Sequence, residues 1–181
     1  MDETHRQLLL LRHAKSSWSK TGLQDHDRPL SRRGQQAAPE MGRYLARSNL
    51  RPDLVLCSTA NRARTTWRLV AKALGGPEVP VKEDRALYHA APSELMEQVR
   101  NAPDEARRIV LVGHNPGMES LAQHLAGDRS DEDKLMQLQD KYPTAGLALF
   151  QVDAPSWAGV IAKNCTLIDF VTPRELQLRT S

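Results

Sequence analysis

Residues 7–13 read QLLLLRH, in which four consecutive leucines lead into the basic pair Arg12 and His13. An uninterrupted apolar run of this length is typical of a strand that is buried on both faces of a parallel sheet. Such a strand delivers the polar residues that follow it to its C-terminal end. The stretch therefore predicts a buried strand and places Arg12 and His13 where chemistry can begin.

Two other apolar stretches are also followed directly by polar residues. Residues 53–57, DLVLC, lead into the polar segment 58–62, and residues 108–112, RIVLV, lead into GHNP at 113–116. Between these strands, helix-capping residues and apolar residues spaced to fall on one helical face indicate helices. We expect helices at 32–48, from after Ala60 to about Leu74, at 92–101 and at 117–126, and further strands at 79–82, 146–152 and 158–171.

Strands that alternate with helices predict a three-layer α/β/α sandwich with a mostly parallel central sheet. The strands expected at 146–152 and 158–171 are joined by a turn and should form an antiparallel edge. We interpret the charged segment 128–141 as a helix in preference to a mobile surface segment, and residues 172–181 as a tail. The length of 181 residues predicts one domain over 1–181.

Composition narrows the class of protein. The hydrophobic share of 40%, charged share of 26% and net charge of +3 fit a globular protein that accepts anionic substrates. With 4% aromatic residues and no basic stripe, nucleic acid is not an expected partner. The start of the chain lacks the pattern of a signal peptide, and no membrane span is visible, so we expect a cytoplasmic protein. We also expect a monomer. Cys57 and Cys165 are expected as two buried thiols.

The three strand ends converge in a parallel sheet, because the carboxyl ends of its strands share one edge. They bring together two imidazoles and two guanidiniums, from His13, His114, Arg12 and Arg62. Guanidinium forks match phosphate oxygens, and a neutral imidazole is a good nucleophile toward phosphorus. The other histidines show no spacing typical of metal ligands, so we expect neither a metal site nor a cofactor.

Several motifs, in one order, resemble the histidine phosphatase superfamily, whose fold is that of phosphoglycerate mutase. They are LLLLRHAKSSW at 8–18, CSTANRARTT at 57–66 and VLVGHNPGMESLA at 110–122. A narrower resemblance is to the SixA-type phosphohistidine phosphatases, and it runs from about residue 7 to residue 175. It is carried by DHDRPLSRRG at 25–34, ALYHAAP at 86–92, GHNPGMESLA at 113–122 and KYPTAG at 141–146.

The resemblance implies a role for each matching residue. His13 would be the nucleophile, and Arg12, Arg62 and His114 would bind phosphate. The expected substrate-binding residues are Ser16, Ser19, His89 and Asn115. Two positions are equally compatible with His89, the edge of the substrate pocket and an ordinary loop.

Other polar residues stay open or are read as structural. The larger mutase-like relatives carry a glutamate as general acid where this chain has Tyr88 and His89. Asp25, Asp27 and Arg28 are interpreted as a salt-bridge cluster at a helix entry. Trp18 could line the mouth of the pocket or pack under the loop.

The resemblance implies a metal-independent phosphatase that forms a phospho-His13 intermediate and acts on a phosphorylated protein, such as a phosphotransfer-type domain. A phosphatase of small phosphomonoesters or nucleotides is the alternative, because fold and motif do not separate the two. A catalytically silent phosphate-binding or interaction module is the alternative of another class. All four candidate residues, His13, Arg12, Arg62 and His114, are present, which argues against a module without catalytic activity.

Overall fold

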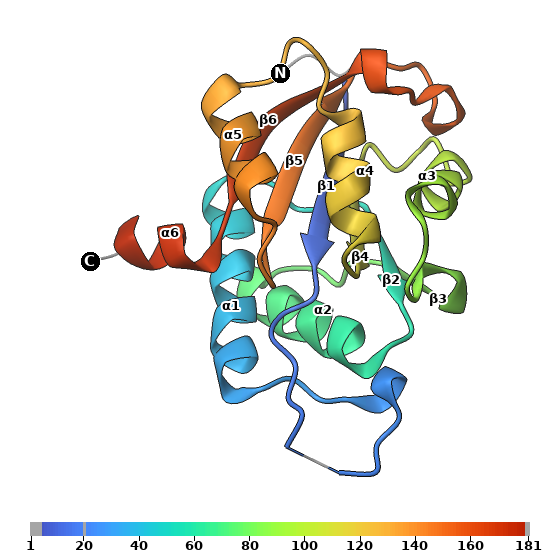
Figure 1. Ribbon diagram of the computed structural model, residues 1–181. Helices are drawn as coiled ribbons and strands as arrows, with labels where there is room; N and C mark the ends of the chain where they lie inside the picture. The colour runs from blue at the N-terminus through green and yellow to red at the C-terminus, as the bar shows by residue number, and fades with distance from the viewer. Residues whose placement is uncertain (1–4, 20, 180–181) are drawn as a thin grey trace.

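The computed structural model describes residues 5–19 and 21–179 and shows an α/β fold with one mixed sheet (Figure 1). The six strands are ordered β3-β2-β4-β1-β5-β6. They are β1 (Arg6–Arg12), β2 (Leu54–Ser58), β3 (Val81–Asp84), β4 (Arg108–Gly113), β5 (Leu147–Val152) and β6 (Cys165–Val171). The helices are α1 (Arg32–Arg47), α2 (Asn61–Leu74), α3 (Pro92–Arg100), α4 (Gly117–Leu125), α5 (Glu132–Asp140) and α6 (Pro173–Arg179).

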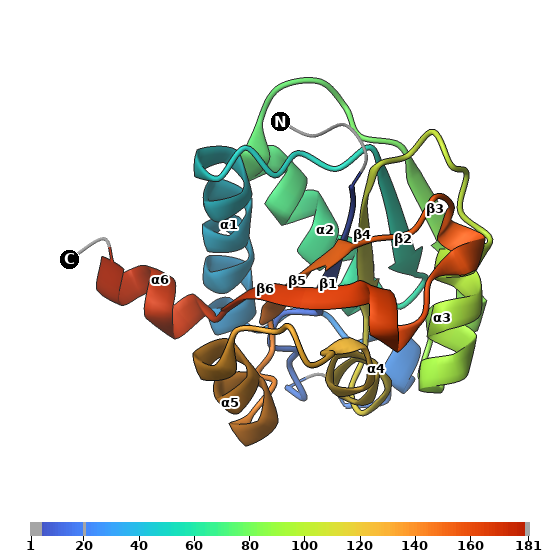
Figure 2. The ribbon, with the colours of Figure 1, turned by 90° about the horizontal axis from the view of Figure 1, so that it is seen from above.

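The leucines of β1 show why the sheet has helices on both faces. Successive side chains of a strand point to opposite faces. Leu8 and Leu10 pack with α3, α4 and α5, while Leu9 and Leu11 pack with α1 and α2. Figure 2 shows α1 and α2 on one side of the sheet and α4 and α5 on the other. The expected three-layer sandwich is therefore confirmed.

The expected strand directions are confirmed as well. Strands β3, β2, β4 and β1 pair in parallel, so their carboxyl ends share one edge. β5 and β6 add the antiparallel end of the sheet. The expected strand at 79–82 lies two residues later, because the parallel register pairs Val55 with Val81 and Ser58 with Asp84.

Helix α1 holds the loop that follows β1. The Ser31 side chain caps α1 by accepting a 3.1 Å hydrogen bond from the Gly34 N–H. A Cβ atom on Gly34 would lie 2.2 Å from the Lys15 carbonyl oxygen, so only glycine permits this approach. The start of the helix is thus packed against the chain just after His13.

The sequence interpretation was wrong for two segments near the C-terminus. The strand expected over 158–171 begins only at Cys165, because the preceding chain turns where Trp157 is buried and its indole N–H donates to Ala106 O at 2.6 Å. The expected tail contains α6, whose start is capped by Thr172 and Glu175 and whose Leu176 is buried. The last two residues of that expected tail, 180–181, lie outside the described residues.

The charged segment forms α5, as expected, with the Asp131 side chain accepting from the Lys134 N–H. Cys57 and Cys165 are both free and buried. Within the described residues, none of the helices is long and apolar enough to cross a membrane.

Candidate functional site

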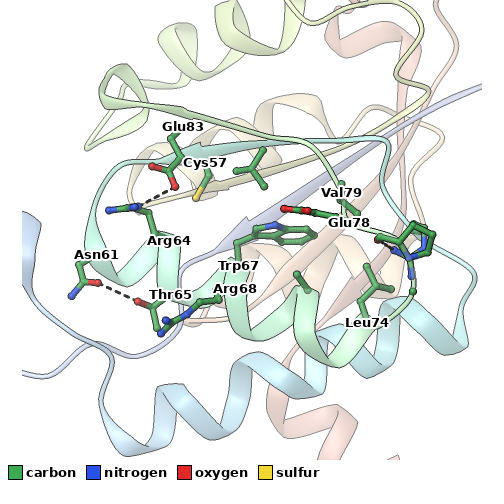
Figure 3. Close-up of a pocket in the computed structure, with 15 residues that line it drawn as sticks. Cys57, Asn61, Arg64, Thr65, Trp67, Arg68, Leu74, Glu78, Val79 and Glu83 are labelled. Carbon is green, nitrogen blue, oxygen red and sulfur yellow. Dashed lines mark hydrogen bonds and ion pairs between the residues drawn. The ribbon is translucent and has the colours of Figure 1, made fainter.

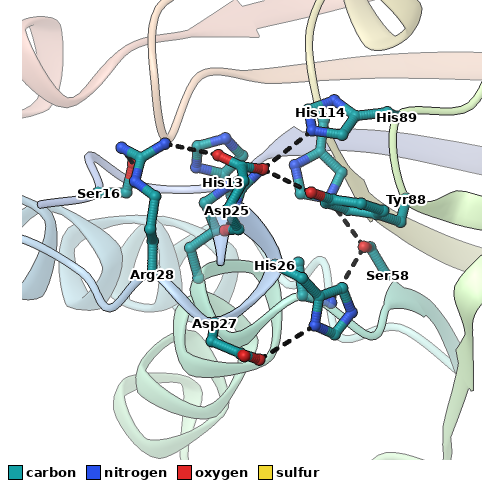
Figure 4. Close-up of polar contacts among 12 residues, drawn as sticks. His13, Ser16, Asp25, His26, Asp27, Arg28, Ser58, Tyr88, His89 and His114 are labelled. Carbon is teal, nitrogen blue, oxygen red and sulfur yellow. Dashed lines mark hydrogen bonds and ion pairs between the residues drawn. The ribbon is translucent and has the colours of Figure 1, made fainter. Parts of the chain in front are cut away.

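The two strand-end histidines meet at the carboxyl edge of β1 and β4. The parallel register pairs Arg12 with Gly113, and the His13 N–H donates to Gly113 O at 3.0 Å. The ring centroids of His13 and His114 are 5.0 Å apart, and the residues are 8% and 3% exposed. Figure 4 shows both rings beside the side chain of Asp25. The sheet therefore brings two buried imidazoles into one pocket.

The His13 ring is held in one tautomer. Its Nδ1 lies 2.7 Å from Ala14 O, and because a carbonyl only accepts, Nδ1 carries the proton and Nε2 carries the lone pair. Burial lowers the pKa of His13 to about 4, and the positive charges of nearby arginines act in the same direction. The ring is therefore neutral near pH 7, the form in which an imidazole is a nucleophile.

His114 is oriented by a neighbouring serine. Its Nε2 lies 2.7 Å from the Ser58 hydroxyl, which also accepts from the Ala60 N–H. A hydroxyl that donates to Nε2 leaves the proton of the neutral ring on Nδ1. Burial lowers the pKa of His114 to about 2, with the neighbouring His13 acting in the same direction. His114 is thus a neutral ring in this pocket, and with the Ser58 hydroxyl as the donor its Nδ1 carries the proton.

Buried polar atoms without a hydrogen-bond partner concentrate at this edge of the sheet. Within the described part of the chain there are four such side-chain atoms, and three of them are Arg12 Nε, His114 Nδ1 and Asn115 Oδ1. Buried donors are normally paired, so unpaired ones mark a place where a ligand belongs. Arg12 Nε is a donor, and His114 Nδ1 donates when it carries the ring proton, so the two atoms suit an anion.

Arg62 enters the pocket from the first turn of α2. The residue is 2% exposed, and its two terminal nitrogens donate to the backbone oxygen of Asp25 at 2.6 Å and to its carboxylate at 2.8 Å. The buried Thr66 hydroxyl donates to Arg62 O and accepts from the Ala14 N–H. Thr66 therefore ties the start of α2 to the chain that follows His13.

The carboxylate of Asp25 collects four side-chain donors. Besides the bond from Arg62, the Tyr88 hydroxyl donates at 2.6 Å, Arg28 donates at 2.8 Å, and His89 Nε2 lies at 3.1 Å. Partial burial raises the pKa of Asp25, but the hydrogen bonds together lower it well below its usual value. Asp25 is therefore ionised at neutral pH and fills an anion-binding position.

The loop before α1 is fastened through Arg28. Its guanidinium donates to the Asp25 carboxylate and, at 2.7 Å, to the buried Ser16 hydroxyl. The Trp18 ring lies over the guanidinium at 3.2 Å from its centroid and is 75% exposed. Trp18 thus stands at the surface rather than under the loop, and the expected ion pair between Asp25 and Arg28 is present.

The remaining candidate binding residues take different positions. His89 has a φ of 53°, and its ring centroid lies 5.2 Å from that of His114. Asn115 donates to the carboxylate of Glu119 and to the Tyr142 backbone oxygen, which also accepts from Arg12. The structure therefore joins His89 and Asn115 to the edge that holds the histidines.

Ser19 is exposed, and its hydroxyl is 2.7 Å from that of Ser17. Within the described residues, this contact does not connect Ser19 to the pocket side chains. The Ser16 hydroxyl accepts from Arg28, which in turn donates to Asp25.

Sequence reasoning did not assign a site role to Asp25, Tyr88, Ser58 or Thr66. Ser58 is the last residue of β2, directly after the apolar stretch 53–57, and that position was the available signal. Asp25 and Tyr88 lie in loops that are 63 residues apart, and no local pattern relates them. Within residues 5–19 and 21–179, no cluster of three His, Cys, Asp or Glu side chains could hold a metal ion.

Comparisons with known proteins identify the family to which this site belongs. The sequence profile of the histidine phosphatase superfamily (branch 1) matches residues 8–91. A Mycobacterium tuberculosis (strain H37Rv) protein described as uncharacterised is 37% identical over 165 residues, covering 91% of this chain and 100% of that protein.

Two solved structures are also similar, and both belong to proteins proposed to be the phosphohistidine phosphatase SixA. The protein from Agrobacterium tumefaciens is 32% identical, with a TM-score of 0.77, and the match covers 93% of this chain and 98% of that one. The protein from Nakamurella multipartitia is 28% identical, with a TM-score of 0.79, and the match covers 93% and 96% of the two chains.

Proposed function

The chain belongs to the SixA-type branch of the histidine phosphatase superfamily and is a phosphatase, and we propose that its substrate is phosphohistidine on a protein, from which it removes the phosphate. Its fold is that of the phosphoglycerate mutase-like SixA structures.

In the proposed reaction, His13 Nε2 attacks the phosphorus of the substrate and the P–N bond breaks. The departing imidazole already carries a proton on its other nitrogen and leaves as a neutral ring. Arg12, Arg62 and His114 stabilise the charge on the equatorial oxygens. Water then attacks phospho-His13, which releases inorganic phosphate and restores the neutral nucleophile.

The charge state of Asp25 carries the proposal. An alkoxide leaving group normally needs a general acid, which contributes roughly 10²–10⁴ in rate. Asp25 is the carboxylate that contacts the pocket side chains Arg62, Tyr88 and His89, and its lowered pKa leaves it without a proton to donate at neutral pH. A phosphohistidine substrate does not require that proton.

The carboxylates on β3 are engaged elsewhere. Glu83 pairs with Arg64 at 3.0 Å, and Asp84 accepts from the Ala86 N–H at the start of the next turn. Neither of the two β3 carboxylates is therefore free to act as a general acid for the pocket.

His89 favours the alternative function, a phosphatase of small phosphomonoesters. Its side chain is 50% exposed and lies beside both Asp25 and His114, at the mouth of the pocket. An imidazolium beside a carboxylate could donate a proton to a departing alkoxide. Removing His89 therefore separates the two functions.

The test measures kcat/KM for a phosphohistidine protein, an alkyl phosphate and an aryl phosphate, in the wild type and in His89→Ala. We expect turnover of the P–N bond to exceed turnover of the alkyl ester and to survive the substitution. Alkyl ester turnover that matches P–N turnover in the wild type, and is lost in His89→Ala, would establish the alternative.

A further inference from the structure

A groove of about 480 Å³ lies beside the candidate site, at the end of the sheet formed by β5 and β6. Figure 2 shows α1 and α5 on the two sides of this end of the sheet, with α6 beyond them. Charged side chains line the groove. Four of them are basic, Lys15, Arg33, Lys141 and Arg174, and two are acidic, Asp140 and Glu175.

The groove is joined to the backbone of the nucleophile. Lys15 is two residues after His13, and its carbonyl accepts from the N–H and the hydroxyl of Ser31. On the other wall, Pro143 and Thr144 precede Ala145, whose N–H donates to His13 O at 3.1 Å. The groove therefore borders the chain on both sides of the His13 backbone, through Lys15 and through Pro143 and Thr144.

The cations of the groove are available to a partner. The side chains of Lys15, Arg33, Lys141 and Arg174 are exposed, and none of them has an ion-pair partner among the described residues. Glu175 accepts from the N–H and hydroxyl of Thr172, while Asp140 is exposed. The four cations outnumber the two acids, so the groove carries a net positive charge.

A second cavity, of about 590 Å³ beside β3 and α2, differs in this respect (Figure 3). Its Arg64 is paired with Glu83, and its Arg51 donates to the backbone oxygens of Pro77 and Gly75. Two of its three arginines are thus engaged within the chain. In the groove beside the nucleophile, by contrast, none of the four cations has an ion-pair partner among the described residues.

Resting on the function proposed above, we propose that this groove docks the phosphohistidine protein through acidic side chains that flank its phosphohistidine. His13 is only 8% exposed, so the substrate protein has to lie on the rim of the pocket to bring its phosphoryl group within reach. The groove is lined by Lys15, two residues after His13, and so lies next to that rim. Complementary charge across such a contact raises the association rate and selects the partner. A free phosphohistidine is too small to use the groove.

The test compares two substrates, a histidine-phosphorylated phosphotransfer protein with an acidic surface and free phosphohistidine. The double variant Arg33→Glu with Lys141→Glu reverses two groove charges. Arg68→Glu with Lys72→Glu makes the same charge change on exposed positions of α2, away from the groove. Turnover of free phosphohistidine reports whether each variant is folded and active.

We expect the groove variant to lower kcat/KM for the phosphoprotein by roughly tenfold or more, to flatten its dependence on salt, and to leave free phosphohistidine within about twofold. The α2 variant should leave both substrates within about twofold. Equal losses on both substrates, or no loss on the phosphoprotein, would overturn the docking proposal. A wild type that hydrolyses phosphomonoesters but neither P–N substrate would overturn the proposed function itself.

Discussion

Arg62 donates to both the backbone oxygen and the carboxylate of Asp25, at 2.6 and 2.8 Å, so that an internal anion occupies the guanidinium proposed to bind phosphate. The same carboxylate is held by Tyr88 and Arg28. A phosphoryl group that binds Arg62 has to share this fork with Asp25 or displace it. We therefore expect Asp25 to influence how tightly the pocket holds an anion.

Replacing Asp25 with asparagine should tighten the inhibition by inorganic phosphate. The substitution keeps the shape of the side chain but removes a negative charge next to the phosphate position, and we expect the inhibition constant to fall by roughly tenfold, about 1.4 kcal/mol. Asp27→Asn is the matched control, because Asp27 lies in the same turn and its side chain is 61% exposed. Identical inhibition constants for the two variants would contradict competition between Asp25 and phosphate.

His13→Ala should abolish turnover, with a loss of more than about 10⁴-fold, because it removes the attacking nitrogen. In the wild type, a quenched reaction should contain a phosphoramidate on His13, labile in acid and stable in base. Chelators should leave the rate unchanged, because the proposed steps use only side chains of this chain. His124→Ala, on the exposed side of α4, serves as the control. An acyl-phosphate intermediate, or inhibition by a chelator that added metal reverses, would disprove the mechanism.

Arg62→Lys should lower kcat/KM by on the order of 10²–10³, even though the charge is kept. A lysine presents a point charge and cannot reproduce a planar fork that binds two oxygens at once. Arg64→Lys is the control, since Arg64 is 56% exposed and pairs with Glu83. Steady-state kinetics of the two variants test this prediction, and equal, mild effects at both positions would show that Arg62 is not the arginine that binds phosphate.

The ring of His13 should titrate near pH 4 in the free enzyme, well below the value of about 6.5 for an unperturbed histidine. Protonation consumes the lone pair of Nε2, so kcat/KM should fall as the pH drops through this value. NMR titration of the ring resonances, assigned by comparison with His13→Ala, measures the midpoint. A midpoint close to 6.5 would show that burial does not lower the pKa.

The same shift affects stability. Because the folded pKa of His13 lies below its unfolded value, the unfolded chain binds more protons between about pH 6.5 and 4. The free energy of unfolding should therefore decrease as the pH falls through this window. Denaturant unfolding of the wild type and His13→Ala at several pH values should show a steeper decrease in the wild type, and equal slopes would remove this contribution.

The parallel strands and the residues at their ends could be predicted from the sequence alone. The leucines before Arg12 and His13 and the apolar run before His114 are local signals, and a parallel sheet brings such strand ends to one edge whatever the loops do. The helix start at Ser31 is equally local, because a cap and the N–H that it accepts are three residues apart. These features needed no knowledge of the rest of the fold.

Long-range packing decided the rest. Asp25 meets Tyr88 and Arg62 only because separate loops close over the same strand edge, and no periodicity in the chain encodes that meeting. The lowered pKa of His13 arises from burial, which exists only in the folded molecule. Helix α6 is held where Leu176 is buried, and the basic groove forms where α1, α5 and α6 come together. Sequence alone determined which groups stand at the strand ends, because strand and cap signals are short-ranged, and the tertiary structure decided their charge, their partners and their access.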